Sequence, residues 1–270
     1  MVVFLIYTIF VRTIKLRIIG AKGDNMKRIL SLSRQAIQKY NMISENDTVA
    51  VGVSGGKDSL VLLCTLTKLS EFYPLCFKVK AISIDAGFDG CNFDEIKKLC
   101  LSLGIEHKIV KSPIKEIVFN NIKPKSPCAL CSKMRRAALC DEALKMGCNK
   151  LALGHNLDDA IETFMMNTLY NGNAMCFEPI THYDDKGISI IRPLVFAPEY
   201  AISRCAGDLV LPVMKKICPM DGNTKREETK EIIANISQKN KNAKKNIFTA
   251  IKNLPEFKKY EVTDANENDG

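Results

Sequence analysis

The sequence of 270 residues contains no tryptophan, no internal repeat and no apolar run long enough to span a membrane. Its longest run of this kind, at residues 1–11, has about half of the ~20 residues that a spanning helix needs. The same stretch lacks the charged lead and the small-residue cleavage site of a secretory signal. We therefore expect a cytoplasmic protein without stable membrane association. We treat residues 1–25 as an extension of uncertain status before a favoured start at Met26.

A second Cys-x-x-Cys pair is also missing. The eleven cysteines are odd in number and irregular in spacing, which does not suit a disulfide framework and favours a reducing compartment. The one pair, Cys128 and Cys131, lies just before a predicted helix, and neither His107 nor His182 has the spacing of a further ligand. By itself the pair could be half of a zinc site, a redox pair or part of an iron–sulfur site.

The sequence has no aromatic pair of the kind that RNA-recognition modules use to stack bases. Its formal net charge of +9 nevertheless suits a partner that carries phosphates. Lysine and arginine gather in the stretches KMRRAALC, KKIC, NTKREETK and SQKNKNAKKNIF. Each stretch alone is consistent with a solvated helix face, but together they could supply the phosphate contacts that an RNA needs.

Strand and helix patterns alternate from about residue 30 onward. Strands are predicted at 47–53, 77–85, 106–112, 149–155 and 187–194, and helices at 30–42, 59–72, 92–104, 132–147, 157–172, 224–238 and 246–254. This alternation predicts an α/β fold, a Rossmann-like parallel sheet with helices on both faces and extra C-terminal helices. Ligands of such sheets bind at the carboxyl ends of the strands. The segments 54–59 and 154–159 and the residue Asp85 all follow strands, so we expect them to face one crevice.

The segment 54–59, Ser-Gly-Gly-Lys-Asp-Ser, has the composition of a phosphate cradle. Gly55 and Gly56 allow a tight bend and close approach of a ligand, and the following helix start offers unpaired N–H groups to an anion. Lys57 adds a charge, Asp58 could hold Mg²⁺, and the serines add hydroxyl groups. The spacing matches neither the nucleoside-triphosphate P-loop nor the dinucleotide motif. The predicted ATP contacts here are Ser54, Gly55, Gly56, Lys57, Asp58 and Ser59.

This segment resembles the SGGxDS signature of the PP-loop ATP pyrophosphatases, which cleave ATP between the α and β phosphates. The resemblance implies that a substrate oxygen attacks the α-phosphate and forms an adenylated intermediate. The pattern GHxxDD at 154–159 resembles the PP-loop enzymes that act on tRNA. We expect Asp159 to act with Lys57 and Asp58 in catalysis, and Asp58 and Asp159 are candidate Mg²⁺ ligands. Asp85, Gly154 and His155 are further predicted ATP contacts, although an acid in a first helical turn also offsets the helix dipole and His155 suits a structural hydrogen bond equally well.

Cys218 lies in a Pro/Gly loop before a predicted helix, where a ligand can be presented without competing with core packing. With the stretches LSRQAIQKYNMI, PCALCSKMRRAAL, GCNKLALGHNLDDAIETFMMN and IRPL, residues 30–240 resemble the tRNA 2-thiocytidine synthetases. The family implies that Cys128, Cys131 and Cys218 hold a [4Fe–4S] cluster with one open iron for a sulfide. A second late cysteine is common in that family, and Asp221 stands in its place here. A persulfide at Cys128 or Cys131, or purely structural cysteines, remain alternatives.

The sequence thus predicts an ATP-dependent tRNA sulfurtransferase that adenylates the C2 carbonyl of a base, with cytidine in the anticodon loop favoured, and replaces its oxygen with sulfur. Its expected cofactors are ATP, Mg²⁺ and the cluster, and its partners tRNA, a sulfur donor such as a cysteine desulfurase or free sulfide, and a second copy in a homodimer. The alternatives are a 2-thiouridine synthetase, whose typical zinc fingers are missing here, a cluster-free PP-loop ligase or amide-forming enzyme, and a non-catalytic nucleotide- and metal-binding module. We expect a catalytic domain at 26–212, a C-terminal segment at 213–258 with the third cysteine, and a disordered tail at 259–270.

Overall fold

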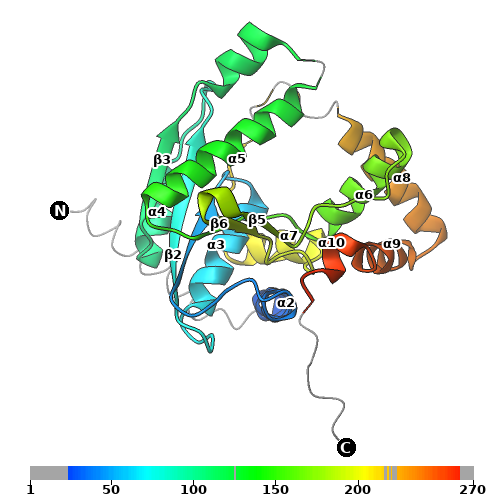
Figure 1. The fold of residues 1–270 in the computed structure, drawn as a ribbon, viewed down its shortest axis with the longest axis horizontal. Helices are drawn as coiled ribbons and strands as arrows, with labels where there is room; N and C mark the ends of the chain where they lie inside the picture. Colours follow the sequence, from blue (N-terminus) through cyan, green and yellow to red (C-terminus); the bar gives the residue numbers. More distant parts are fainter. Residues whose placement is uncertain (1–23, 125, 216–217, 219, 221–223, 262–270) are drawn as a thin grey trace, which may run out of the picture.

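A sheet of six strands forms the centre of the protein (Figure 1). The computed structural model describes residues 24–124, 126–215, 218, 220 and 224–261, so residues 1–23, most of the predicted tail and Asp221 lie outside the described residues. The strand order is β3-β2-β1-β4-β6-β5, and all neighbours are parallel except β5 and β6. The strands are β1 (Asp47–Gly52), β2 (Phe77–Asp85), β3 (His107–Lys111), β4 (Lys150–Ala152), β5 (Ile180–Tyr183) and β6 (Ile188–Ile191).

Helices cover both faces of this sheet, as the alternating pattern predicts. Their bounds are α2 (Asp24–Lys39), α3 (Lys57–Leu69), α4 (Asp94–Leu103), α5 (Pro127–Lys145), α6 (Leu157–Asn171), α7 (Glu199–Asp208), α8 (Lys225–Lys239), α9 (Ala243–Lys252) and α10 (Pro255–Lys258), with a π-helix at Glu116–Ile122. None of the helices in the described part of the chain is long and apolar enough to cross a membrane.

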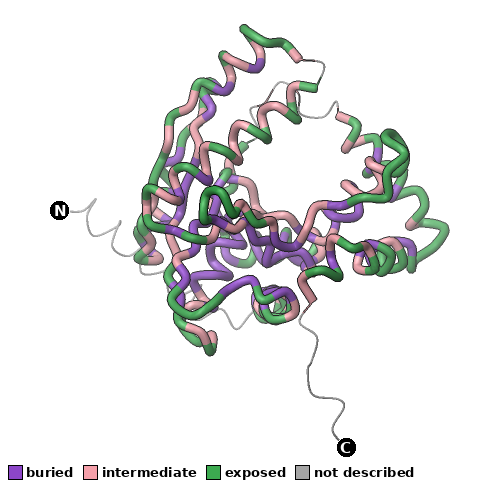
Figure 2. Tube along the Cα trace, viewed as in Figure 1, coloured by how far each residue is buried: buried purple, intermediate pink, exposed green. Residues whose placement is uncertain are grey.

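The central strand β1 is buried on both faces, as expected of a parallel sheet. Val49 and Val51 join the larger core, which α2, α3, α4 and α7 cover, whereas Ala50 faces a second core with Cys140 and Ala143 of α5. Figure 2 shows the buried residues concentrated in the sheet and in the helix that follows β1. Because the strands lie in this fixed parallel order, the loops after β1, β2 and β4 emerge at one edge of the sheet.

The C-terminal helices pack onto α6, and Figure 1 shows α8, α9 and α10 on the side of the sheet away from β3. Phe248 of α9 and Phe257 of α10 belong to the larger core. The ring of Phe257 lies 6.0 Å from that of Tyr40, and the ring of Phe248 lies 6.0 Å from that of Phe196. These aromatic contacts attach the C-terminal helices to the sheet layer, so the position of α8 relative to α6 is set by the fold.

The described residues add five elements that the pattern does not predict: β5, the π-helix, a 3-10 helix at Asp184–Lys186, α7 and α10. It also corrects the placement of the cysteine pair. The sequence pattern places Cys128 and Cys131 just before a helix, but α5 begins at Pro127 and includes both. Proline is favoured at the first position of a helix because its missing N–H would be unpaired there anyway. The two thiols therefore project from the first turns of a helix, three residues apart.

Candidate active site

Hydrogen bonds of its own serines hold the conformation of the loop between β1 and α3. Ser59 Oγ donates a hydrogen bond to the Gly56 carbonyl at 2.8 Å and accepts one from the Ser54 backbone N–H at 3.2 Å. The N-cap of α3 is Gly56, and no side chain in the described part of the chain caps this helix start. Backbone N–H groups at an uncapped helix start are the groups that bind anions. The predicted phosphate cradle therefore has both the shape and the donors for its ligand.

Gly55 is required at its position for two reasons. Its backbone φ angle is +84°, a value that residues other than glycine rarely adopt. A Cβ atom at Gly55 would also lie 2.8 Å from Cγ of Met214, and the Met214 N–H donates to the Gly55 carbonyl at 2.9 Å. The segment after α7 thus covers one side of the loop.

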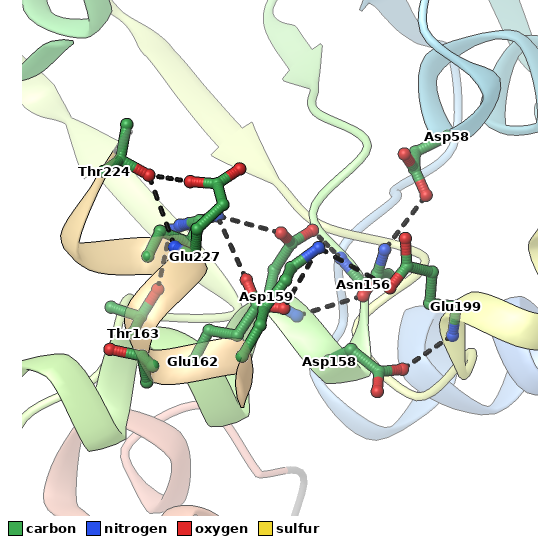
Figure 3. A network of polar contacts seen from close by, with 12 residues as sticks. Asp58, Asn156, Asp158, Asp159, Glu162, Thr163, Glu199, Thr224 and Glu227 are labelled. Atoms are coloured by element: carbon green, nitrogen blue, oxygen red, sulfur yellow. Dashed lines mark hydrogen bonds and ion pairs between the residues drawn. The ribbon is translucent and has the colours of Figure 1, made fainter. Parts of the chain in front are cut away.

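The Gly-His-Asn-Leu-Asp-Asp segment lies directly against the start of α3. A Cβ atom at Gly154 would lie 3.1 Å from the backbone carbonyl carbon of Asp58, so only glycine fits without displacement. Asn156 Nδ2 donates to Asp58 Oδ1 at 3.0 Å, and Figure 3 shows these two side chains pointing toward each other. The structure therefore brings together the two segments that the sequence analysis assigns to one crevice.

Asp159 is held by a reciprocal capping box with Asn156. The Asp159 N–H donates to Asn156 Oδ1, and Asp159 Oδ2 accepts from the Asn156 N–H, both at 3.0 Å. The other carboxylate oxygen, Oδ1, pairs with Arg226 of α8 at 3.0 Å. Burial raises the pKa of Asp159, although the backbone hydrogen bond from Asn156 and the charge of Arg226 oppose the shift. Asn156 thus links the two carboxylates, Asp58 and Asp159, that are predicted to bind Mg²⁺.

Asp158 has a structural role in this arrangement. Its side chain is buried, with Oδ2 accepting from the Glu199 backbone N–H at 2.6 Å and Oδ1 pairing with Lys244 at 2.5 Å. Figure 3 shows the contact to Glu199 at the first residue of α7. The Asp158 carboxylate therefore joins α6 to α7 and α9.

Lys57 forms ion pairs with two carboxylates. Its Nζ lies 2.8 Å from Glu199 Oε1 and 3.3 Å from Asp58 Oδ2. Burial of the amine opposes its charge, but the hydrogen bond to Glu199 and the charges of Asp58 and Glu199 outweigh it, so the pKa of Lys57 is raised. The lysine is therefore fully charged at neutral pH, as a phosphate ligand must be.

Asp85 is one of the remaining predicted ATP contacts. It ends β2 and accepts from the Gly87 N–H at 3.0 Å. It lines a cavity of about 300 Å³ with Gly87, Lys111, Ser112 and Pro113. Among the described residues, no hydrogen bond joins Asp85 to the Asp58–Asn156 pair. Asp85 thus lies at the same edge of the sheet but in a neighbouring part of it.

His155 is partly buried, and its ring packs against that of Phe177, with 5.1 Å between ring centroids. Burial, reinforced by the charges of Arg192 and other arginines, lowers the pKa of His155 to about 3. The imidazole is therefore neutral and cannot serve as a general acid at neutral pH. Its Nδ1 is buried without a hydrogen-bond partner among the described residues.

The three predicted cluster cysteines lie near one another. Cys131 and Cys218 pack, with Met134 and Leu130, on an apolar patch formed by Ala86, Phe88, Ile114 and Val118. Burial raises the pKa of both Cys128 and Cys131, and the charge that Cys218 would carry raises each of them further. Arg135 opposes this shift at Cys131 through its charge and a hydrogen bond. A helix start and a later loop thus converge on one apolar wall.

The donor type and the surroundings of these residues suit an iron–sulfur cluster. Among the described residues, no three histidine, cysteine, aspartate or glutamate side chains form a group that could hold a metal ion. A [4Fe–4S] cluster places each thiolate on a different iron atom, so its ligands surround the cluster instead of meeting at one point. All eleven cysteines are free thiols, and apolar surroundings are typical of such clusters. The donor type and the surroundings therefore match.

Several residues of this site carry no sequence signal. Glu199 follows Pro198 at the start of a helix that the periodicity does not reveal. Arg226 and Lys230 are visible only as members of the basic run at the start of α8, although they pair with Asp159 and with Glu199 and Glu162. Their partners are distant in the chain, so only the fold identifies them.

Comparisons with known proteins agree with this geometry. Residues 29–208 match the PP-loop domain family. A tRNA-cytidine(32) 2-sulfurtransferase of Citrifermentans bemidjiense is 35% identical over 230 residues, which cover 84% of this chain and 90% of that protein. The protein of the same name from Pelobacter propionicus is 35% identical and covers 84% and 86%. The solved structure of the U34-tRNA thiolase NcsA from Methanococcus maripaludis with its [4Fe–4S] cluster has a TM-score of 0.70 and 29% identity, covering 84% of this chain and 78% of that one.

Proposed function

The chain belongs to the PP-loop domain family and, within it, to the tRNA-cytidine(32) 2-sulfurtransferases, and we propose that it replaces the C2 oxygen of a tRNA cytidine with sulfur at the expense of ATP. A carbonyl oxygen is a poor leaving group until it is bonded to phosphorus. In the first step this oxygen attacks the α-phosphate of ATP, and pyrophosphate leaves. A sulfur nucleophile then attacks C2, and AMP leaves with the former carbonyl oxygen.

The chain's own residues supply the activation step. The N–H groups at the start of α3 and the Lys57 amine bind the phosphates, while Gly55 allows the bend of the loop and Gly154 lets its own segment pack against the start of α3. Asp58 and Asp159, joined through Asn156, are the proposed Mg²⁺ ligands. Two carboxylates suffice because Mg²⁺ typically takes only one or two from the protein, with phosphates and water completing its shell.

Cys128, Cys131 and Cys218 are the proposed ligands of a [4Fe–4S] cluster. When bound, the cluster supplies an iron without a protein ligand, where a sulfide can be held. Cys131 and Cys218 lie on an apolar wall, which would limit the access of water to a cluster held there. The observation that carries the proposal is that the three thiols lie close enough for their charges to affect the pKa of Cys128 and of Cys131, and that Cys131 and Cys218 pack on Ala86, which follows β2. A PP-loop ligase that forms an amide has no use for such a group of thiols.

The substrate and partners complete the proposal. The target base must leave its stack to place its C2 carbonyl against the α-phosphate. The sulfur donor is a cysteine desulfurase or free sulfide, the enzyme acts in the cytoplasm, and a homodimer is its proposed assembly. The likeness to the U34-tRNA thiolase favours one second candidate, a uridine substrate with the same chemistry.

Mass spectrometry of tRNA nucleosides from cells with and without this gene tests the proposal. We expect 2-thiocytidine to disappear without the gene and to return with the wild type. It should not return with Lys57→Ala or Cys218→Ser. Cys76→Ser is the matched control, since Cys76 is an exposed thiol outside the site.

Each other result of this experiment has a defined meaning. Loss of a 2-thiouridine instead would mean that the substrate base is a uridine and that the proposed mechanism still holds. Persistence of every thionucleoside would refute sulfur insertion. Full activity of Cys218→Ser would refute the cluster ligands.

A further inference from the structure

Glu199 occupies the position beside Lys57 where a phosphate is expected. Its Oε1 lies 2.8 Å from the lysine Nζ, closer than the 3.3 Å to Asp58. Both side chains are partly accessible, Lys57 at 29% and Glu199 at 36%, so a ligand can reach them. The charge that the loop offers to ATP is therefore already paired within the protein.

A second lysine stands on the other side of the same carboxylate. Lys230 Nζ of α8 lies 3.8 Å from Glu199 Oε2 and 3.5 Å from Glu162 Oε1. The two oxygens of Glu199 thus face two different cations. Its backbone is fixed, because the Glu199 N–H donates to the buried Asp158 carboxylate at 2.6 Å. Only the side chain needs to move for Glu199 to leave Lys57 and approach Lys230.

We propose that Glu199 takes the place of a phosphate beside Lys57 in the empty enzyme and passes to Lys230 when MgATP binds. The triphosphate would place several negative charges next to Lys57, and these repel the Glu199 carboxylate. Lys230 is already within ion-pair distance and receives it. The inference rests on the ATP binding of the proposed function. It adds Glu199 and Lys230 as the residues that change partners when ATP binds.

The exchange predicts the direction of change for three variants. Glu199→Gln removes the competitor of ATP for Lys57, so MgATP should bind about threefold more tightly, as expected for a partly exposed ion pair. Lys230→Gln removes the receiver, so Glu199 stays on Lys57 and binding should weaken about threefold. In the double variant no Glu199 carboxylate needs a receiver, so the loss of Lys230 should have no further effect and the affinity should equal that of Glu199→Gln.

Titration calorimetry with MgATP and no tRNA measures these affinities without any turnover. Glu228→Gln is the matched control, because it removes one carboxylate of α8 that pairs with Lys225 and contacts Tyr170, away from Lys57. We expect its affinity to match the wild type. Glu199→Ser is a second variant with the same expected direction, which keeps a polar residue at the start of α7 if glutamine there impairs folding.

The opposite results would overturn the inference. Weaker MgATP binding by Glu199→Gln would mean that Glu199 contributes directly to the nucleotide or Mg²⁺ site. An equal loss from Lys230→Gln with and without Glu199 would mean that Lys230 contacts the phosphates itself. Tighter binding by Glu228→Gln would reduce the effect to overall charge. Failure of the wild type to bind MgATP would refute the proposed function together with the inference.

Discussion

Replacing Gly154 with alanine adds one carbon between the two halves of the nucleotide site. The added Cβ would lie 3.1 Å from both the Asp58 carbonyl carbon and the Ser59 backbone nitrogen, and 3.2 Å from the Asp58 carbonyl oxygen. All three are backbone atoms in the first turn of α3, so they cannot rotate away as the end of a side chain could. The loop after β4 and the start of α3 must therefore separate.

The size of the effect follows from these contacts. Carbon atoms pack best at about 3.5–4.0 Å, so the two segments must separate by roughly half an ångström. Overpacking of this kind costs about 1–3 kcal/mol. Alanine also restricts the unfolded chain, which offsets about 0.4–1 kcal/mol. We expect Gly154→Ala to lose about 1–2 kcal/mol of unfolding free energy and, because the Asp58–Asn156 contact is stretched, to bind MgATP more weakly.

Urea unfolding and MgATP titration of the same preparations provide the measurement. Gly207→Ala is the matched control, because Gly207 lies in α7 and a Cβ atom there would meet nothing within 4 Å outside its own stretch of helix. That substitution should stabilise the protein by about 0.5–1 kcal/mol, since glycine is the poorer helix former. If Gly154→Ala were as stable as the wild type and bound MgATP equally well, the close approach of the two segments would not matter.

The sheet and the two loops could be predicted because local pattern and tertiary position agree there. A buried parallel strand such as β1 is a continuous apolar run, and its end is marked by the glycines of the loop that follows. The rule that ligands bind at the carboxyl ends of strands then places Asp58 beside the segment that begins at Gly154. The hydrogen bond between Asp58 and Asn156 is consistent with that placement.

The ion pairs of the site could not be predicted, because they depend on how distant helices pack. Lys57 and Glu199 are 142 positions apart, and Asp159 and Arg226 are 67 apart. Neither pair leaves a periodic signal. The short strand β5 has only four residues, too few to show a period of two, and it pairs antiparallel to β6 at the edge of the sheet. The role of His155 depends on burial, which the sequence leaves open.

Two further predictions concern the cysteines and a buried acid. After anaerobic reconstitution, the wild type should bind about four iron atoms per chain and Cys131→Ser far fewer. Cys140 is a buried thiol in the same helix, so Cys140→Ser should match the wild type. Equal iron content in all three proteins would contradict the ligand set. Glu162 is buried among Arg226, Lys230 and Asp159, and burial raises its pKa from 4.5 to about 7. Between pH 4.5 and about 7, Glu162 is protonated in the folded protein but ionised in the unfolded chain. The stabilisation from Glu162 is therefore complete below about pH 4.5 and falls as the pH rises to about 7. At about 1.4 kcal/mol per unit the loss is at most about 3 kcal/mol. Glu162→Gln cannot titrate, so urea unfolding from about pH 5 to about pH 8 should show the wild type losing stability relative to this variant up to neutral pH and no further above it. Parallel profiles of the two proteins would mean that Arg226 and Lys230 keep the buried carboxylate ionised throughout.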